Sequence, residues 1–182
     1  MTIHKTRKGN WMQTYSGRKF WPVDPRADEL DINDIAHALA KMCRYGGHCT
    51  RFYSVAEHCV LVARHAPREL ALTALLHDAS EAYLVDIPRP IKANLSNYAE
   101  IEHEIMLTVA KRYGIQWPVP DEVKRLDNAI LADERAQNMA TMDVPPRDWG
   151  SDEPPLHVKL CFWSPETAAT EFLSSFYQYG GK

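Results

Sequence analysis

Apolar residues recur at helical spacing, every three or four positions, over most of the chain. The first such run predicts a helix of three turns, because its apolar side chains would share one face. Asp31 or Asn33 is placed to cap its start, and Gly46-Gly47 would end it. The run consists of Ile32, Ile35, Ala36, Leu39, Ala40 and Met42 or Cys43.

Two further helices are predicted in the middle of the chain. Ser54-Val55-Ala56-Glu57 has the capping-box pattern, in which the serine accepts from an unpaired backbone N–H and the glutamate reaches back to the cap. This start predicts a helix to about Ala66. Pro67 suits the first turn of the next helix, which we expect to reach Tyr83. Its apolar residues lie on most sides, so it is expected to form the buried centre.

The remaining pattern is also mostly helical. Pro88 and Pro90 predict an extended loop. Helices are expected from Asn97 to Tyr113, from Asp121, and from Ser164-Pro165. Residues 12–25 predict a short hairpin or loop, and the proline-rich residues 143–158 predict a surface loop. The fold class expected is therefore all-α, a helical bundle with a short irregular or hairpin N-terminal segment.

Composition limits the classes of function. The chain has 182 residues, which indicates one domain on a prior of roughly 150 residues per domain. A net charge of −3 does not favour a nucleic-acid polymer or an anionic membrane as partner. Four cysteines are too few for a disulfide framework, and neither a signal peptide nor a membrane span is recognisable. We therefore expect a cytoplasmic protein with reduced thiols.

Ionisable residues interrupt the apolar pattern at three places. His58 lies one turn inside the helix that Ser54 begins, His77-Asp78 follows the apolar run Ala74-Leu75-Leu76, and Asp127 interrupts a later run. A buried, unpaired carboxylate costs several kcal/mol, so such groups must be hydrogen-bonded, ion-paired or bound to metal. Glu81 follows at a spacing that would place it on the same helix face as His77 and Asp78.

In their order and spacing these residues resemble a known family. Ser54 to His58, His77-Asp78-Ala79-Ser80-Glu81-Ala82, Asp86 to Lys92 and then Asp127 resemble the motifs of the HD-domain metal-dependent phosphohydrolases. The resemblance is to small bacterial and phage 5′-deoxynucleotidases and to phage deoxynucleoside triphosphate triphosphohydrolases. It covers about residues 50–140 well and the Trp21-Pro22 region loosely.

The resemblance implies a metal site and a catalytic group. His58, His77, Asp78 and Asp127 would bind one divalent ion, Glu81 would act as acid or base, and Asp86 would position water or sugar. Two imidazoles and two carboxylates suit Mn, Co, Fe or Ni and tolerate Zn or Mg. A metal in such a site acidifies water and offsets charge on phosphoryl oxygens.

Candidate substrate contacts lie outside this group. By the resemblance, Trp21 would line the nucleoside pocket, with Arg18 or Lys19 replacing an arginine that the family places directly before the tryptophan, where this chain has Phe20. Lys92 would meet phosphate. Arg44, with His48 and Arg51, could add phosphate contacts through its guanidinium. Each also has an ordinary alternative, a core aromatic residue for Trp21 and a solvated surface cation for Lys92.

Several alternatives stay open at this stage. The activity expected is release of phosphate from a nucleoside monophosphate. Release of tripolyphosphate from a deoxynucleoside triphosphate and nucleotide binding without turnover are the rivals. Cys43, His48 and Cys49, with His58 or Cys59, form a weaker zinc candidate, because the cysteine spacing lacks the usual Cys-x2–4-Cys pair. We expect one domain over residues 1–182, with residues 1–30 and 143–165 covering the site, a small nucleotide as partner, and a homo-oligomer left open.

Overall fold

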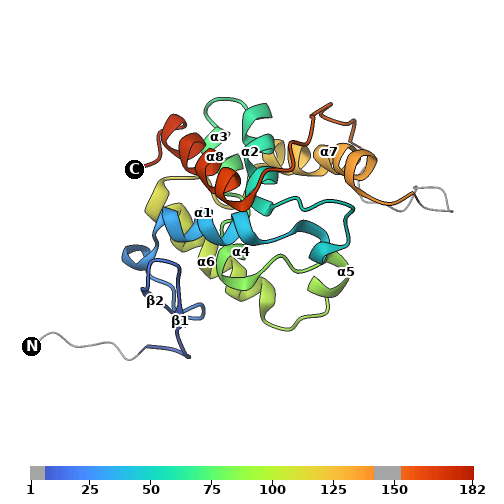
Figure 1. The fold of residues 1–182 in the computed structure, drawn as a ribbon. Coiled ribbons are helices and arrows are strands. Elements are labelled where there is room, and N and C mark those ends of the chain that lie inside the picture. Colours follow the sequence, from blue (N-terminus) through green and yellow to red (C-terminus); the bar gives the residue numbers. More distant parts are fainter. Residues whose placement is uncertain (1–6, 142–152) are drawn as a thin grey trace, which may run out of the picture.

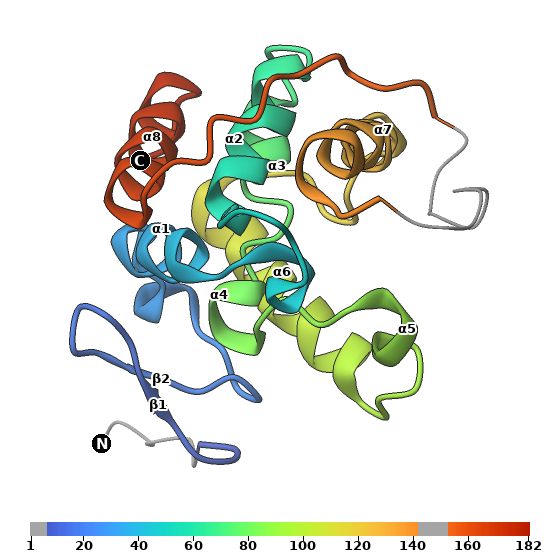
Figure 2. The ribbon, with the colours of Figure 1, turned by 45° about the vertical axis from the view of Figure 1, so that its right-hand side comes forward.

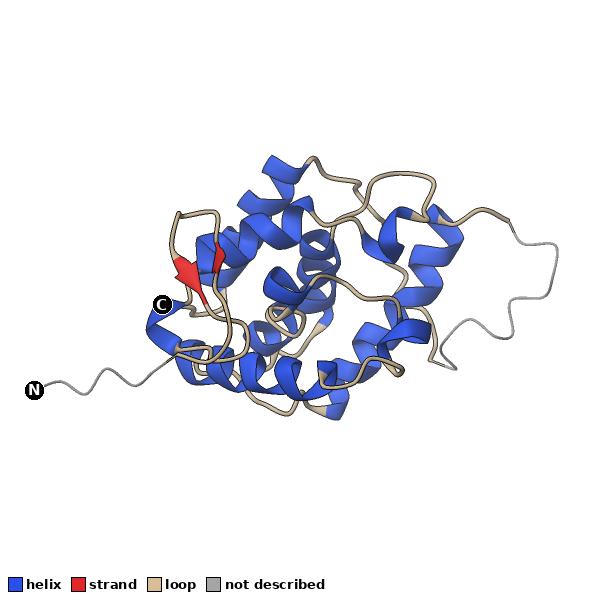
Figure 3. Ribbon diagram, turned by 90° about the horizontal axis from the view of Figure 1, so that it is seen from below, coloured by secondary structure: helices blue, strands red, loops and turns tan. Residues whose placement is uncertain are grey.

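Helices make up most of the described residues in this computed structural model, which describes residues 7–141 and 153–182 (Figures 1 and 3). The elements in chain order are β1 Met12–Gln13, β2 Lys19–Phe20, the 3-10 turn η1 Ala27–Glu29, α1 Ile32–Lys41, the 3-10 turn η2 Arg44–Gly47, α2 Val55–His65, α3 Ala71–Leu75, α4 Glu81–Leu84, α5 Arg89–Lys92, α6 Tyr98–Tyr113, α7 Asp121–Asn138 and α8 Pro165–Gln178. The all-α class and the N-terminal hairpin are confirmed. No helix within these two ranges is long and apolar enough to cross a membrane.

Three helix starts predicted from polar caps are confirmed. The side chains of Asp31, Ser54 and Ser164 each accept from a backbone N–H in the first turn of α1, α2 and α8. At the other end of α6, Gly114 has φ 71°, a left-handed conformation that glycine adopts without strain and that ends the helix as predicted. Local sequence signals therefore define these four helix boundaries.

The prediction of a single helix from Pro67 to Tyr83 is wrong. Helix α3 ends at Leu75, and residues 76–80 form successive tight turns before the single turn of α4. The cause lies in the side chain of His77, whose Nδ1 donates to the carbonyl of Ala74 at 2.7 Å. A side chain that takes a nearby backbone carbonyl competes with helical pairing. His77 and Asp78 therefore lie in a turn and not on a helix face.

The proline segment is also different from the prediction. Residues 88–92 do not form an extended loop, because Arg89–Lys92 makes the short helix α5. Pro88 precedes this helix and Pro90 lies in its first turn, where a missing N–H costs no helical hydrogen bond. The two prolines thus begin a helix.

Helix α2 is the centre of the packing. All residues from Val55 to Ala63 are buried, and α2 contacts α1, α3, α7 and α8. In both views α1 and α8 lie on one side of α2, whereas α5 and α7 lie on the other (Figures 1 and 2). The hairpin is on the α1 side, where buried Phe20 stacks on Tyr83 with ring centroids 3.9 Å apart. The buried centre is therefore α2 and not the segment after Pro67.

Glu57 ties the C-terminal part of the chain to α2. The capping box is half formed, because Ser54 accepts from the backbone of Glu57 but the Glu57 carboxylate turns elsewhere. It accepts from the backbone N–H groups of Cys161, Phe162 and Trp163 at 2.7, 2.9 and 2.7 Å. Three charge-assisted bonds satisfy this fully buried carboxylate. The proline-rich segment expected to cover the site falls partly outside the described residues, at 142–152.

Candidate metal centre

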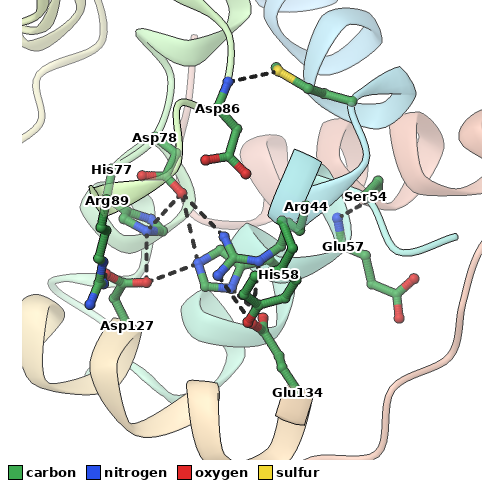
Figure 4. Close-up of polar contacts among 12 residues, drawn as sticks. Arg44, Ser54, Glu57, His58, His77, Asp78, Asp86, Arg89, Asp127 and Glu134 are labelled. Carbon is green, nitrogen blue, oxygen red and sulfur yellow. Dashed lines mark hydrogen bonds and ion pairs between the residues drawn. The ribbon is translucent and has the colours of Figure 1, made fainter. Parts of the chain in front are cut away.

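Four side chains from three separate segments converge beside α2. His58 comes from α2, His77 and Asp78 come from the turn after α3, and Asp127 comes from α7 (Figure 4). One donor atom each from His58, His77 and Asp127 lies within 4.8 Å of the others, and Cys59, His77 and Asp78 form a second such set. We call His58, His77, Asp78 and Asp127 the candidate metal centre.

The two imidazoles point their Nε2 atoms at the two carboxylates. Nε2 of His58 lies 3.1 Å from Oδ1 of Asp127, and Nε2 of His77 lies 3.2 Å from Oδ2 of Asp78. The crossed distances are 3.8 Å for His58 to Asp78 and 3.7 Å for His77 to Asp127. Both Nε2 atoms are buried and lack hydrogen-bond geometry to any described group. Buried polar atoms rarely stay unsatisfied, so this donor set fits a bound cation.

A hydrogen bond at Nδ1 fixes the orientation of each imidazole ring. Nδ1 of His58 donates to Oε1 of Glu134 at 2.8 Å, and Nδ1 of His77 donates to the carbonyl of Ala74. Because carboxylate and carbonyl oxygens only accept, Nδ1 of each ring carries a proton, and Nε2 is the ring nitrogen that faces the centre and would bind a metal ion. Metal-ligating histidines are oriented in this way by a carboxylate or a backbone carbonyl.

Glu134 is a functional residue that the sequence did not reveal. It is fully buried on α7 and accepts from Arg44, at 3.0 Å to the terminal nitrogen, and from the Tyr45 hydroxyl. Burial raises the pKa of Glu134, but the charges of Arg44 and His58 outweigh burial and lower it to about 2. Glu134 is therefore an anion behind His58. No local motif marks it, because it follows Asp133 in a helix rich in charged residues.

Arg44 was predicted to contact substrate, and the structure gives it a different place. Its side chain is 10% exposed, is paired with Glu134, and lies 4.0 Å from Oδ2 of Asp78. A guanidinium engaged in this way is not free to bind a phosphate group. Arg44 instead links Glu134 to the carboxylate of Asp78.

The carboxylates of the candidate metal centre are ionised. Burial raises the pKa of Asp127, but its contacts with His58 and His77 hold it well below its usual value. Burial likewise raises the pKa of Asp78, and the adjacent His77 lowers it overall. Two carboxylates and two imidazole Nε2 atoms make a donor set that suits a divalent cation.

Glu81 and Asp86, the predicted catalytic pair, both lie in the surroundings of Asp78. Glu81 is 8% exposed and its Oε2 has no hydrogen-bond partner among the described residues. Burial raises the pKa of Glu81 well above its usual value, and the charges of Asp78 and Asp86 raise it further. Burial also raises the pKa of Asp86, whose carboxylate points toward the candidate metal centre in Figure 4.

Helix α5 contributes two cations. Arg89 is 60% exposed, and its terminal nitrogen lies 3.4 Å from Oδ2 of Asp127. It was not among the predicted site residues, although it stands between Asp86 and Lys92 in the motif segment. Lys92 pairs with Glu102 at 2.6 Å and lies over the Tyr98 ring. Arg89 thus places an exposed guanidinium beside Asp127.

The predicted nucleoside contacts lie in the N-terminal segment. The guanidinium of Arg7 lies over the Trp21 ring, 4.1 Å from the ring centroid. The Lys19 ammonium lies over the Trp11 ring. Arg18 lines a separate hollow beside Asp31 and Tyr113. Within the described ranges, none of the three contacts the candidate metal centre.

The zinc alternative has no support in the described part of the chain. Sγ of Cys43 lies 3.5 Å from Sγ of Cys49, but His48 does not join them in a cluster of three possible ligands. Cys59 is buried next to His58 and belongs to the second set named above. All four cysteines are free thiols.

The fold and this group of residues define a class, an all-α protein with a buried histidine and carboxylate centre that could hold a metal ion. The chain is 41% identical over 126 residues to Uncharacterized protein YfdR of Escherichia coli (strain K12), an alignment that covers 69% of this chain and 71% of that protein. It is 38% identical over 128 residues to Uncharacterized protein RCAP_rcc00048 of Rhodobacter capsulatus, covering 65% of each. The chain therefore belongs to the family of YfdR. It matches no family model.

Proposed function

We propose that this protein is an HD-domain phosphohydrolase that releases phosphate from nucleoside or deoxynucleoside 5′-monophosphates. The observation that carries the proposal is the convergence of two bare imidazole Nε2 atoms on Asp78 and Asp127 from three separate segments. The order of these residues along the chain is the order that resembles the HD-domain enzymes. The choice of a nucleotide as substrate rests on that resemblance.

His58, His77, Asp78 and Asp127 would hold one divalent ion of the Mn, Co, Fe, Ni, Mg or Zn series. The ion would supply positive charge that polarises a phosphoryl group and lowers the pKa of a nearby water molecule. The chain itself supplies the orientation of the ligands. Glu134 and the Ala74 carbonyl hold the two rings through Nδ1, so that each Nε2 atom stays directed inward.

Glu81 is suited to the proton transfer. Burial and the charges of Asp78 and Asp86 raise the pKa of its carboxyl group, which favours the protonated form, and one of its oxygens has no partner in the described protein. A protonated carboxyl beside the reacting group can donate to the leaving oxygen of a phosphate ester. Asp86, on the opposite side of Asp78 from His77 in Figure 4, would then orient water or the sugar.

The cations favour a monophosphate over a triphosphate. Arg44 is paired with Glu134 and lies 4.0 Å from Asp78, so one of the three residues expected to add phosphate contacts is already engaged. Arg89 and Lys92 remain near the centre, and Arg89 is exposed enough to meet one phosphoryl group. The presence of Glu81 favours turnover over nucleotide binding alone.

A product assay tests this function. Nucleoside mono- and triphosphates are offered with each of Mn, Co, Fe, Ni, Mg and Zn, and inorganic phosphate and tripolyphosphate are quantified separately. We expect phosphate from monophosphates in wild type and none from Asp127→Asn. Asp121→Asn, on the same helix but with a side chain 98% exposed, should match wild type. Tripolyphosphate as the product, or equal turnover by Asp127→Asn, would refute the proposal.

A further inference from the structure

Two cysteine side chains are in contact on the segment that follows α1. Sγ of Cys43 lies 3.5 Å from Sγ of Cys49, and both residues are partly exposed. All four cysteines lie in the described ranges, and the structure brings no other two of them into contact. Cys59 is fully buried in α2, and Cys161 is exposed on the C-terminal segment. We call Cys43 and Cys49 the cysteine pair.

The backbone between the two cysteines turns sharply, and this turn brings them together. Tyr45, Gly46 and Gly47 have φ of 58°, 58° and 83°, three left-handed conformations in succession. Glycine adopts this conformation without steric cost, so the two glycines let the chain reverse within η2. The backbone N–H of His48 closes the turn by donating to the carbonyl of Tyr45 at 3.0 Å.

Both ends of the turn are held to the rest of the fold. At the first end, the backbone N–H of Arg44 donates to the carbonyl of Tyr53 at 2.9 Å. At the second end, Asn138 of α7 accepts from the backbone N–H groups of Thr50 and Arg51, at 2.8 Å each. Because these hydrogen bonds fix the backbone on both sides, the two thiols are neighbours in the folded protein.

The contact between the two sulfurs also affects the acidity of Cys49. Burial, together with the hydrogen bond to Cys43, raises the pKa of the Cys49 thiol to about 11. Its Sγ also donates to the carbonyl of Arg51 at 3.1 Å. Since a thiolate reacts faster than a thiol, Cys49 is a poor first target for an oxidant. It is instead placed to attack a neighbouring sulfur that has already been oxidised.

We infer that Cys43 and Cys49 form a reversible disulfide when the protein meets a peroxide or a low-molecular-weight disulfide. With hydrogen peroxide, Cys43 becomes a sulfenic acid and one water molecule is released. Cys49 then attacks this sulfur, and the sulfenic hydroxyl leaves with the thiol proton as a second water molecule. The two thiols lose two electrons and two protons. With a small disulfide, two exchange steps release two small thiols instead.

The disulfide would enclose the segment that holds Glu134. Arg44 and Tyr45 lie between the two cysteines, and both donate to the Glu134 carboxylate that accepts from His58. Closing a covalent ring around them restricts the unfolded chain and so stabilises the folded one. Oxidation would therefore fix the support of the candidate metal centre. The inference needs neither metal nor substrate, so it does not depend on the proposed function.

Oxidation of the full chain tests the inference. The protein is treated with a small excess of hydrogen peroxide or of glutathione disulfide, and free thiols and intact mass are measured. We expect two of the four thiols to be lost, the mass to fall by two hydrogen atoms, and dithiothreitol to restore both. Peptide mapping should link residues 43 and 49. The unfolding midpoint of the oxidised protein should be roughly 3–8 °C higher than that of the reduced protein.

Substitutions then locate the disulfide. Cys43→Ser and Cys49→Ser each leave one thiol of the cysteine pair, so neither should form the linked peptide or gain in unfolding midpoint. Cys161→Ser removes an exposed cysteine outside the pair and is the matched control, which should oxidise like wild type. The inference is overturned if wild type keeps all four thiols or forms only oxidant adducts. It is also overturned if Cys43→Ser still forms an intramolecular disulfide, or if oxidised and reduced wild type unfold at the same temperature.

Discussion

Glu134 and His58 form the contact that sets the orientation of the candidate metal centre. The 2.8 Å hydrogen bond from Nδ1 of His58 to Glu134 places Nε2 of the same ring 3.1 Å from Oδ1 of Asp127. Glu134 is held in turn by Arg44. A buried arginine, a buried glutamate and a histidine thus form a chain of contacts that ends at Nε2 of His58.

Replacement of Glu134 should weaken metal binding without removing a ligand. In Glu134→Gln the neutral amide no longer increases the basicity of His58, so affinity for Mn or Co should fall roughly 10- to 100-fold. Titration of the apo-protein with the ion measures this. Glu122→Gln, on the exposed part of the same helix, is the control. An affinity within twofold of wild type for Glu134→Gln would show that the contact does not position the ligand.

Glu81 should separate metal binding from turnover. Because it is not one of the four proposed ligands, Glu81→Gln should keep wild-type metal content and lose on the order of 10²- to 10⁴-fold in kcat for nucleotide hydrolysis. Metal analysis together with phosphate release makes the measurement. Glu100→Gln, at an exposed position of α6, should change neither quantity. Full activity of Glu81→Gln would exclude Glu81 as the proton donor.

Arg44 and Glu134 should be coupled in stability. Arg44→Met leaves a buried carboxylate without its strongest partner, so the free energy of unfolding should fall by about 3–5 kcal/mol. Arg44→Met combined with Glu134→Leu removes both charges and should cost less than the sum of the two single changes. Urea denaturation of the four proteins provides the comparison. Strict additivity would mean that the pair is not energetically coupled.

Acid should weaken the fold partly through Glu134. Its pKa of about 2 lies below the ordinary value of about 4.3, so the group binds more protons in the unfolded chain. Its contribution is present above the ordinary pKa and is lost as pH falls toward about 2. The difference in unfolding free energy between wild type and Glu134→Gln should therefore shrink from about pH 5 to about pH 3. A difference that is constant over this range would contradict the assignment.

Sequence reasoning succeeded where one local signal decides the structure. Capping side chains located the starts of α1, α2 and α8, and Gly114 located the end of α6. It failed after α3, because the helix is ended by a side chain, that of His77, whose competing hydrogen bond to Ala74 leaves no trace in periodicity. The two prolines before Lys92 could be interpreted as a loop or as a helix start, and the structure adopts the second.

The residues of the site also divide into those that the sequence predicts and those that only the fold reveals. His58, His77, Asp78 and Asp127 stand out as ionisable residues in apolar runs, and the structure brings all four together. Glu134 could not be found in this way, because its importance comes from a contact with a residue 76 positions away. Arg44 was assigned to substrate because an isolated arginine near a motif has no visible partner until the chain folds.

Glu57 and His58 are neighbours in α2 but contact different parts of the chain. Glu57 accepts hydrogen bonds from the backbone of residues 161–163, whereas His58 belongs to the candidate metal centre. The partners of Glu57 follow it by more than a hundred residues, and those of His58 include Asp127 and Glu134. During synthesis α2 would therefore leave the ribosome long before the groups that hold both side chains. If the candidate metal centre holds an ion, stable capture would have to await synthesis of the chain through Glu134, long after α2 itself.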